Sequence, residues 1–88
     1  MKLVLYSRQG CCLCKGLEEK LRGLDGAPAL QVVDVDRDPE LQARFGLEVP
    51  VLAREGPQGE LQLLPRVSPR LGGTALLRWL NQQHESLG

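Results

Sequence analysis

Long hydrophobic runs and aromatic residues are scarce in this sequence. Its 88 residues include one Trp, one Tyr and one Phe. No segment approaches the roughly 18 consecutive apolar residues of a membrane-spanning helix. The opening segment "MKLVLYSRQG" turns polar after an apolar run of about four residues, which is too short for the core of a signal peptide. We therefore expect a cytoplasmic protein with no membrane partner.

An excess of charge of either sign is also absent. The 11 basic and 11 acidic residues give a formal net charge of zero at pH 7. Because binding to nucleic acid requires a basic surface, this balance predicts no nucleic-acid partner. A chain of this length supports one hydrophobic core, so residues 1–88 are expected to form a single domain, and we expect a monomer.

Cysteine is absent everywhere except in the segment "GCCLC" at residues 10–14, which holds all three. Disulfides that stabilise small secreted domains join positions far apart in sequence, which these three cysteines cannot do. A structural zinc site needs about four ligands in two spaced pairs, and His84 is the only other soft ligand in the chain, so no metal site is predicted. The cluster indicates redox or thiolate chemistry in a reducing compartment, and the alternative is a coincidence of small residues of a type that is often buried. No tightly bound cofactor is expected.

The spacing of apolar residues predicts the element order β-α-β-α-β-β-α. Helices are expected at residues 12–24, at 39–45 and from 74 onward. Strands are expected at residues 2–6, 29–36, 49–53 and 60–64. A right-handed crossover makes the first two strands parallel, and the turn "REGPQG" makes the last two antiparallel. The fold class is therefore α/β, a central four-stranded mixed sheet with helices on both faces.

The second helix has clear end signals. Asp38 is the expected N-cap, Pro39 takes the first helical position and Gly46 ends the helix. Asp34, Asp36 and Asp38 also imitate the start of a calcium-binding loop. Pro39 stands where that loop requires glycine, so we interpret the segment as a strand end followed by a capped helix.

The first helix should place its cysteines in different environments. Its leucines recur at helical spacing and predict a buried stripe: Leu13, Leu17, Leu21 and Leu24. Cys14 lies at the edge of this stripe and is expected to be half-buried, whereas Cys12 points away from it.

Cys11 is the predicted nucleophile. It falls at the N-cap or first turn of the helix, and Arg8 lies in the same loop. The helix dipole and a nearby cation both lower the pKa of a thiol from about 8.5 toward neutrality. Cys14, three positions later, can attack a mixed disulfide formed at Cys11.

Two further groups leave alternatives open. Cys12 is a passive small residue, a site of oxidation or glutathionylation, or a partner in an intermolecular disulfide. A disulfide between Cys11 and Cys12 is not expected, because it distorts the backbone. The arginines of the second half are expected on a solvated surface, and the alternative is a cationic cluster beside the cysteines: Arg54, Arg66 and Arg70.

The chain resembles the glutaredoxin branch of the thioredoxin fold, and more narrowly the short glutaredoxin-like proteins of bacteria. Three segments carry the resemblance: "YSRQGCCLC", "VVDVDRDPELQARFGLEVPVL" and "GGTALLRWL". The C-x-x-C motif followed by "EVPV" is its most specific part. The resemblance implies a cis bond between Val49 and Pro50, which exposes the backbone of Val49 to a substrate.

The same resemblance implies residues for a glutathione site. Arg8 takes the place of a lysine that meets a glutathione carboxylate, and Gly72 and Gly73 resemble glycines that let the glutathione backbone approach. Thr74 is positioned to supply a hydroxyl and a helix-terminal N–H.

The chain departs from the family pattern at this predicted site. Cys12 and Leu13 replace the proline and tyrosine that glutaredoxins often carry between the cysteines. Thr74 and Ala75 replace acidic residues that usually meet the glutathione amine.

These observations predict a thiol-disulfide oxidoreductase that acts on a disulfide-containing protein or small thiol. Its dithiol would be restored by glutathione as co-substrate or by a thioredoxin-type reductase. The alternatives are a non-catalytic redox sensor or adaptor, and a [2Fe–2S] cluster carrier that binds the cluster through Cys11.

Overall fold

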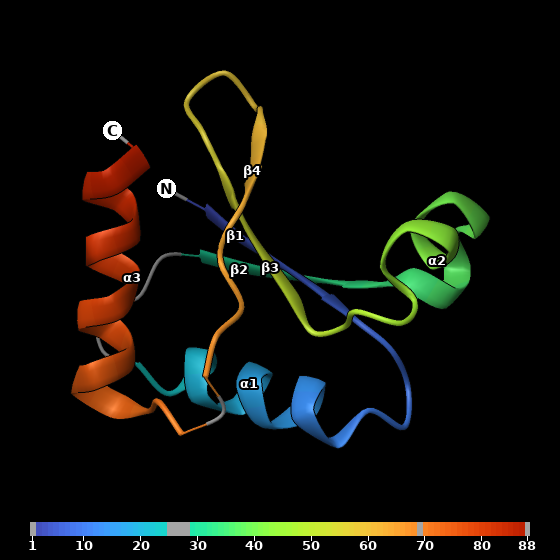
Figure 1. The fold of residues 1–88 in the computed structure, drawn as a ribbon, viewed down its shortest axis with the longest axis horizontal. Coiled ribbons are helices and arrows are strands. Elements are labelled where there is room, and N and C mark those ends of the chain that lie inside the picture. Colours follow the sequence, from blue (N-terminus) through green and yellow to red (C-terminus); the bar gives the residue numbers. More distant parts are fainter. Residues whose placement is uncertain (1, 25–28, 69, 88) are drawn as a thin grey trace.

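The computed structural model describes residues 2–24, 29–68 and 70–87, and Figure 1 shows their arrangement. The strands are β1 (Lys2–Ser7), β2 (Ala29–Asp34), β3 (Val51–Glu55) and β4 (Leu61–Leu63). The α-helices are α1 (Cys12–Arg22), α2 (Pro39–Phe45) and α3 (Gly73–Leu87), and a 3-10 helix, η1 (Val35–Arg37), follows β2.

The four strands form one mixed sheet in the order β2-β1-β3-β4. β1 pairs in parallel with β2, with Leu5 opposite Val32, and antiparallel with β3, with Leu5 opposite Leu52. β3 and β4 form the predicted antiparallel pair. The predicted α/β fold class and the order β-α-β-α-β-β-α are therefore confirmed.

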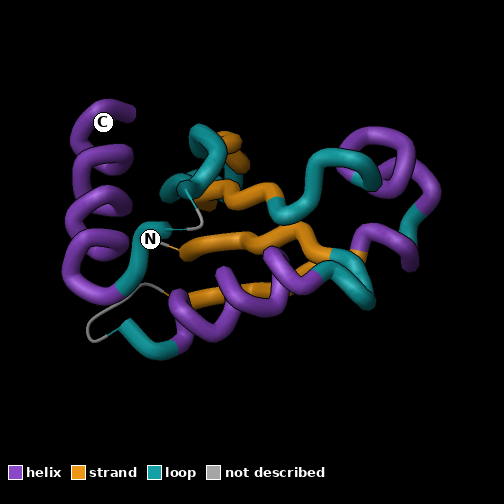
Figure 2. Tube along the Cα trace, turned by 60° about the horizontal axis from the view of Figure 1, so that its bottom comes forward, coloured by secondary structure: helices purple, strands orange, loops and turns teal. Residues whose placement is uncertain are grey.

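Alternation along β1 divides the core between the two faces of the sheet. One face, which carries Leu3 and Leu5, packs against α1 and α3 in the larger cluster of buried residues: Leu3, Leu5, Leu17, Leu21, Leu52, Leu64, Leu76 and Leu80. The other face, which carries Val4 and Tyr6, packs against η1 and α2 through a smaller cluster: Val4, Tyr6, Val35, Phe45 and Ala53. In both views α2 and α3 lie at opposite ends of the sheet (Figures 1 and 2).

The end signals of the helices act as the sequence predicts. The Asp38 carboxylate accepts the backbone N–H of Glu40 at 3.0 Å, Pro39 opens α2, and Gly46 caps its end. At the end of α1, the N–H of Gly23 donates to the Glu19 carbonyl at 3.1 Å. α1 therefore ends at Arg22, two residues before the predicted end at residue 24, and residues 25–28 lie outside the described part of the chain.

β2 is shorter than predicted. It ends at Asp34 because the Asp34 carboxylate accepts the N–H of Asp36 at 3.0 Å and starts η1. Val35, which lies in this 3-10 helix, is completely buried. Val32 and Val33 are only half-buried, because β2 is an edge strand.

The expectation of a solvated Arg54 is wrong. Arg54 alternates onto the same face of β3 as Leu52, only 9% of the residue is exposed, and its Nη2 donates to Gln62 Oε1 at 2.9 Å. Arg66 and Arg70 are exposed as expected. Among the helices within the described ranges, none combines the length and the apolar character needed to cross a membrane.

Candidate active site

The loop after β1 brings Cys11 and Cys14 together at the start of α1. Gly10 adopts φ +80°, a left-handed conformation that favours glycine, and turns the chain into the helix. Cys11 is the N-cap, its N–H donates to the Arg8 carbonyl at 3.3 Å, and its Sγ accepts the N–H of Cys14 at 3.2 Å. The two cysteines form a disulfide with their Cα atoms 5.3 Å apart.

The two sulfurs of this disulfide differ in burial. Cys14 is 0% exposed, so the prediction that it is half-buried underestimated its burial, whereas Cys11 is partly exposed. Cys12 is exposed and is a free thiol. A sulfur atom of another molecule can therefore reach Cys11 from solvent, and it cannot reach Cys14 unless the protein rearranges. The amide donor and the helix N-terminus also favour negative charge on the Cys11 sulfur.

Arg8 ties the cysteine loop to η1 and α2. Its guanidinium binds the Asp36 carboxylate through Nε at 3.2 Å and through Nη2 at 3.0 Å, and its Nη1 donates to the Gly46 carbonyl at 2.9 Å. All three nitrogens are therefore engaged within the chain. Sequence reasoning missed Asp36 and Gly46 as partners, because nothing in their spacing points to a loop some 30 to 40 residues away. A contact between Arg8 and a glutathione carboxylate stays a prediction.

The Val49-Pro50 peptide bond is cis, which confirms the expectation from the family resemblance. The N–H of Val49 donates to the Phe45 carbonyl at 3.0 Å, so a hydrogen bond holds the residue before Pro50 to the end of α2. On the other side, Nη2 of Arg66 donates to the Glu48 carbonyl at 3.2 Å. Arg66 thus holds the segment that precedes Pro50, a role that the sequence did not indicate.

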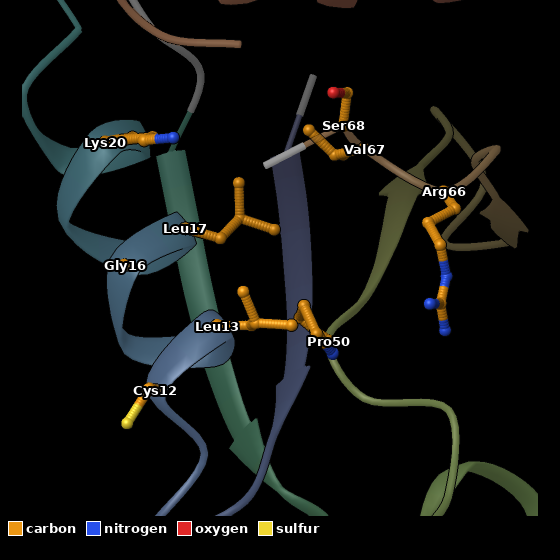
Figure 3. Close-up of a pocket in the computed structure, with 9 residues that line it drawn as sticks. All are labelled: Cys12, Leu13, Gly16, Leu17, Lys20, Pro50, Arg66, Val67 and Ser68. Carbon is orange, nitrogen blue, oxygen red and sulfur yellow. The ribbon is translucent and has the colours of Figure 1, made fainter. Parts of the chain in front are cut away.

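Leu13 does not join the buried stripe. It is 60% exposed, although Leu17 and Leu21 are buried as predicted. Figure 3 shows its side chain directed toward Pro50 and that of Cys12 directed away. Leu13 and Pro50 border a hollow of about 200 Å³, which also contacts Leu17, Lys20, Arg66 and Val67.

A second hollow, of about 470 Å³, lies beside Cys11. Its lining includes charged groups of both signs: Arg8, Lys15, Glu18 and Asp34. Cys12 borders both hollows. The start of α1 therefore separates a mainly apolar hollow beside Pro50 from a charged one beside Cys11.

The predicted glycine pair lies at the start of α3. Gly73 begins the helix with φ +55°, and Gly72 lies near the aliphatic chain of Lys20. Gly72, Gly73 and Thr74 are not among the described residues that line either hollow. Their contribution to glutathione binding stays a prediction.

The described residues offer no group of three or more His, Cys, Asp or Glu side chains placed to hold a metal ion. The chemistry that this arrangement supports directly is thiol-disulfide exchange at Cys11.

Comparison with known proteins supports the assignment of the fold. The sequence model of the family described as Glutaredoxin-like domain (DUF836) matches residues 2–81. The X-ray structure of target protein XcR50 from X. campestris is 34% identical in sequence. The similarity covers 91% of this chain and 96% of that one, with a TM-score of 0.58.

Another solved structure, described only as a malarial protein, is 14% identical and covers 93% of this chain and 94% of its own. Its TM-score of 0.57 shows a shared fold. The curated proteins contain no match to this chain.

Proposed function

Because this chain belongs to the Glutaredoxin-like domain (DUF836) family, we propose that it is a thiol-disulfide oxidoreductase with Cys11 as nucleophile and Cys14 as resolving cysteine. The observation that carries the proposal is the asymmetric disulfide at the start of α1. Cys11 is the partly exposed N-cap, and Cys14 is completely buried behind it. Only the first of these sulfurs is open to an incoming disulfide.

The proposed cycle begins with the reduced dithiol. The Cys11 thiolate attacks one sulfur of a substrate disulfide, a new bond to Cys11 forms, and the other substrate sulfur leaves as a thiolate that takes a proton from water. Cys14 then releases its proton to solvent and attacks the Cys11 Sγ, which frees the second substrate thiol. The substrate gains two electrons, and the protein is left with the Cys11–Cys14 disulfide.

Regeneration needs an external pair of electrons. We propose glutathione as the reductant: two molecules reduce the Cys11–Cys14 disulfide and leave as glutathione disulfide. The family resemblance supports this choice. A thioredoxin-type reductase supplies the same two electrons in the alternative scheme.

The test is turnover of a glutathione mixed disulfide in the presence of reduced glutathione. Cys11→Ser should abolish turnover, because no other exposed sulfur occupies the N-cap. Cys14→Ser should retain it, since glutathione itself can resolve the mixed disulfide at Cys11. Cys12→Ser, which removes a thiol from the same turn, is the matched control and should stay close to the native rate.

Other outcomes would redirect the assignment. Full activity in Cys11→Ser would refute the proposed nucleophile. A native protein that has no activity and absorbs visible light after purification would favour the [2Fe–2S] cluster carrier. An inert protein without such absorbance would favour a sensor or adaptor, in which the cysteines respond to oxidation without turnover.

A further inference from the structure

Cys11 lines only one of the two hollows at the start of α1. It borders the charged hollow of about 470 Å³, whereas the hollow beside Pro50 is lined by Cys12 and Leu13 and not by Cys11. Because Cys11 is also the partly exposed cysteine of the disulfide, a small molecule that enters the charged hollow lies directly beside the proposed nucleophile. We refer to this feature as the Cys11 hollow.

The size and the lining of the Cys11 hollow suit a small polar molecule. Its volume falls within the roughly 300–1,000 Å³ of small-molecule sites. Its lining includes the polar side chains of Ser7 and Gln9 in addition to four charged side chains. Val32 is the single aliphatic side chain in the described lining, so the hollow offers little to a long apolar group.

The charged side chains of the Cys11 hollow are opposed within the chain, with one exception. Three of them lie within ion-pair distance of an opposite charge: Arg8 with Asp36 at 3.0 Å, Glu18 with Arg22 at 2.9 Å and Asp34 with Arg37 at 3.9 Å. The fourth is Lys15, which is exposed, and within the described ranges no hydrogen bond or ion pair engages its ammonium group. Lys15 is therefore the charge that this hollow presents to a ligand.

Lys15 stands one helical turn after Cys11. Its backbone N–H donates to the Cys11 carbonyl at 3.1 Å, and both residues line the same hollow. Residues four positions apart lie on one side of a helix, with their Cβ atoms about 5–6 Å apart. A ligand whose sulfur meets Cys11 can therefore place a carboxylate, a few bonds away, at the Lys15 ammonium group. The N-terminus of α1 favours the same negative charge.

We propose that the substrate is a low-molecular-weight disulfide with a carboxylate close to the attacked sulfur, and that Lys15 binds this carboxylate in the Cys11 hollow. The inference rests on the proposed function and names its substrate class. The Cys11 thiolate attacks the substrate, the substrate's S–S bond breaks, and the first carboxylate-bearing thiolate leaves and takes a proton from water. Cys14 then displaces the second thiol from Cys11 as in the cycle above. The substrate gains two electrons, and the protein is left with the Cys11–Cys14 disulfide.

The experiment measures single-turnover oxidation of the reduced native protein, so that no external reductant is needed. Three small disulfides differ in charge: dithiodipropionic acid is anionic, bis(2-hydroxyethyl) disulfide is neutral and cystamine is cationic. Chromatography follows the released thiols. Because the three leaving thiols differ in pKa, their rates differ before any binding is considered. Each rate is therefore divided by the rate with the neutral disulfide, and this ratio is compared between native and variant protein.

We expect Lys15→Gln to lower the ratio of the anionic to the neutral rate about threefold, the size of a charge contact at an exposed site. High salt should remove this difference between native and variant protein. The ratio of the cationic to the neutral rate should rise in the same variant. Lys15→Arg keeps the charge and should keep both ratios.

Two controls accompany the Lys15 variants. Arg78→Gln removes the same charge from an exposed position on α3 that lines neither hollow at the start of α1, and it should leave both ratios unchanged. The comparison is repeated in Cys12→Ser, because Cys12 is a second exposed thiol at the Cys11 hollow. The same ratios in this background assign the effect to Cys11.

Ratios that stay at their native values in Lys15→Gln would overturn the inference and leave the proposed function standing. This includes a loss of rate that is equal for all three disulfides, which is the result if Lys15 acts only on the pKa of the Cys11 thiol. A native protein that reduces none of the disulfides would overturn the proposed function as well.

Discussion

The first prediction concerns Arg8, whose guanidinium lies in a network within the chain. Replacing Arg8 by methionine keeps most of the aliphatic length and removes the charge. The change removes the two-point contact with Asp36 and the hydrogen bond to the Gly46 carbonyl. We expect Arg8→Met to lower the free energy of unfolding, because the cysteine loop loses its attachment to η1 and α2.

The magnitude follows from exposure. The Arg8 and Asp36 side chains are 34% and 36% exposed, so solvent screening limits their ion pair to about 0.5–1 kcal/mol. The hydrogen bond to Gly46 adds about 1 kcal/mol. Arg8→Met should therefore cost about 1.5–2 kcal/mol, and Asp36→Asn about 0.5–1 kcal/mol. Asparagine keeps an oxygen for the hydrogen bond that Gln42 donates to Asp36 Oδ1 at 3.2 Å.

Urea unfolding of the oxidised protein measures these losses. Each single variant removes the same Arg8–Asp36 ion pair, so the double variant loses that pair only once. Its loss in free energy of unfolding should therefore equal that of Arg8→Met alone within error. The matched control is Arg22→Met, which breaks the exposed pair between Arg22 and Glu18 on α1 and should cost about 0.3–0.5 kcal/mol. Strictly additive losses for Arg8→Met and Asp36→Asn would refute the network and return Arg8 to the role of a free cation beside Cys11.

Three further predictions concern the helices. Leu76→Ala should lower the free energy of unfolding by about 3–5 kcal/mol, measured in urea, because Leu76 is 0% exposed where α3 meets the sheet. Gly73→Ala should destabilise the protein by about 1 kcal/mol, because Gly73 has a left-handed φ of +55°. Gly16→Ala, inside α1, should instead stabilise it by about 0.5–1 kcal/mol, because the added Cβ meets open space. Thermal unfolding of the two variants measures the sign of each change. Cys11 of the reduced protein should react with iodoacetamide at a pH well below the 8.5 or so of a free thiol, and a pH profile of its alkylation that matches free cysteine would contradict the effect of the helix N-terminus.

Local sequence signals predicted most of the fold because they act over a few residues. Asp38, Pro39 and Gly46 define α2 through contacts within that helix, and the turn "REGPQG" predicts the antiparallel pair of β3 and β4. The end of β2 escaped prediction because it depends on a competition between a strand ladder and the side-chain capping of η1 by Asp34. The spacing of apolar residues does not show which of the two, the strand or the capped 3-10 helix, is the more stable at this point.

The candidate site was predictable where it is local and unpredictable where it joins distant segments. The roles of Cys11 as N-cap and Cys14 as its neighbour follow from their spacing at the start of a helix. Arg66 and one nitrogen of Arg8 donate to main-chain carbonyls, those of Glu48 and Gly46. Every residue offers such a carbonyl, so no residue type marks these positions in the sequence.

Leu13 shows why a correct helical angle can still give the wrong environment. Its spacing from Leu17 and Leu21 places all three on one side of α1, and the last two are buried against the sheet. Angle alone does not state how far the neighbouring layer extends along the helix. At the first turn α1 meets Pro50 and a hollow, so the same side of the helix that forms core further along is left uncovered beside the disulfide. The leucine between Cys11 and Cys14 is therefore exposed, although its spacing alone places it in the core.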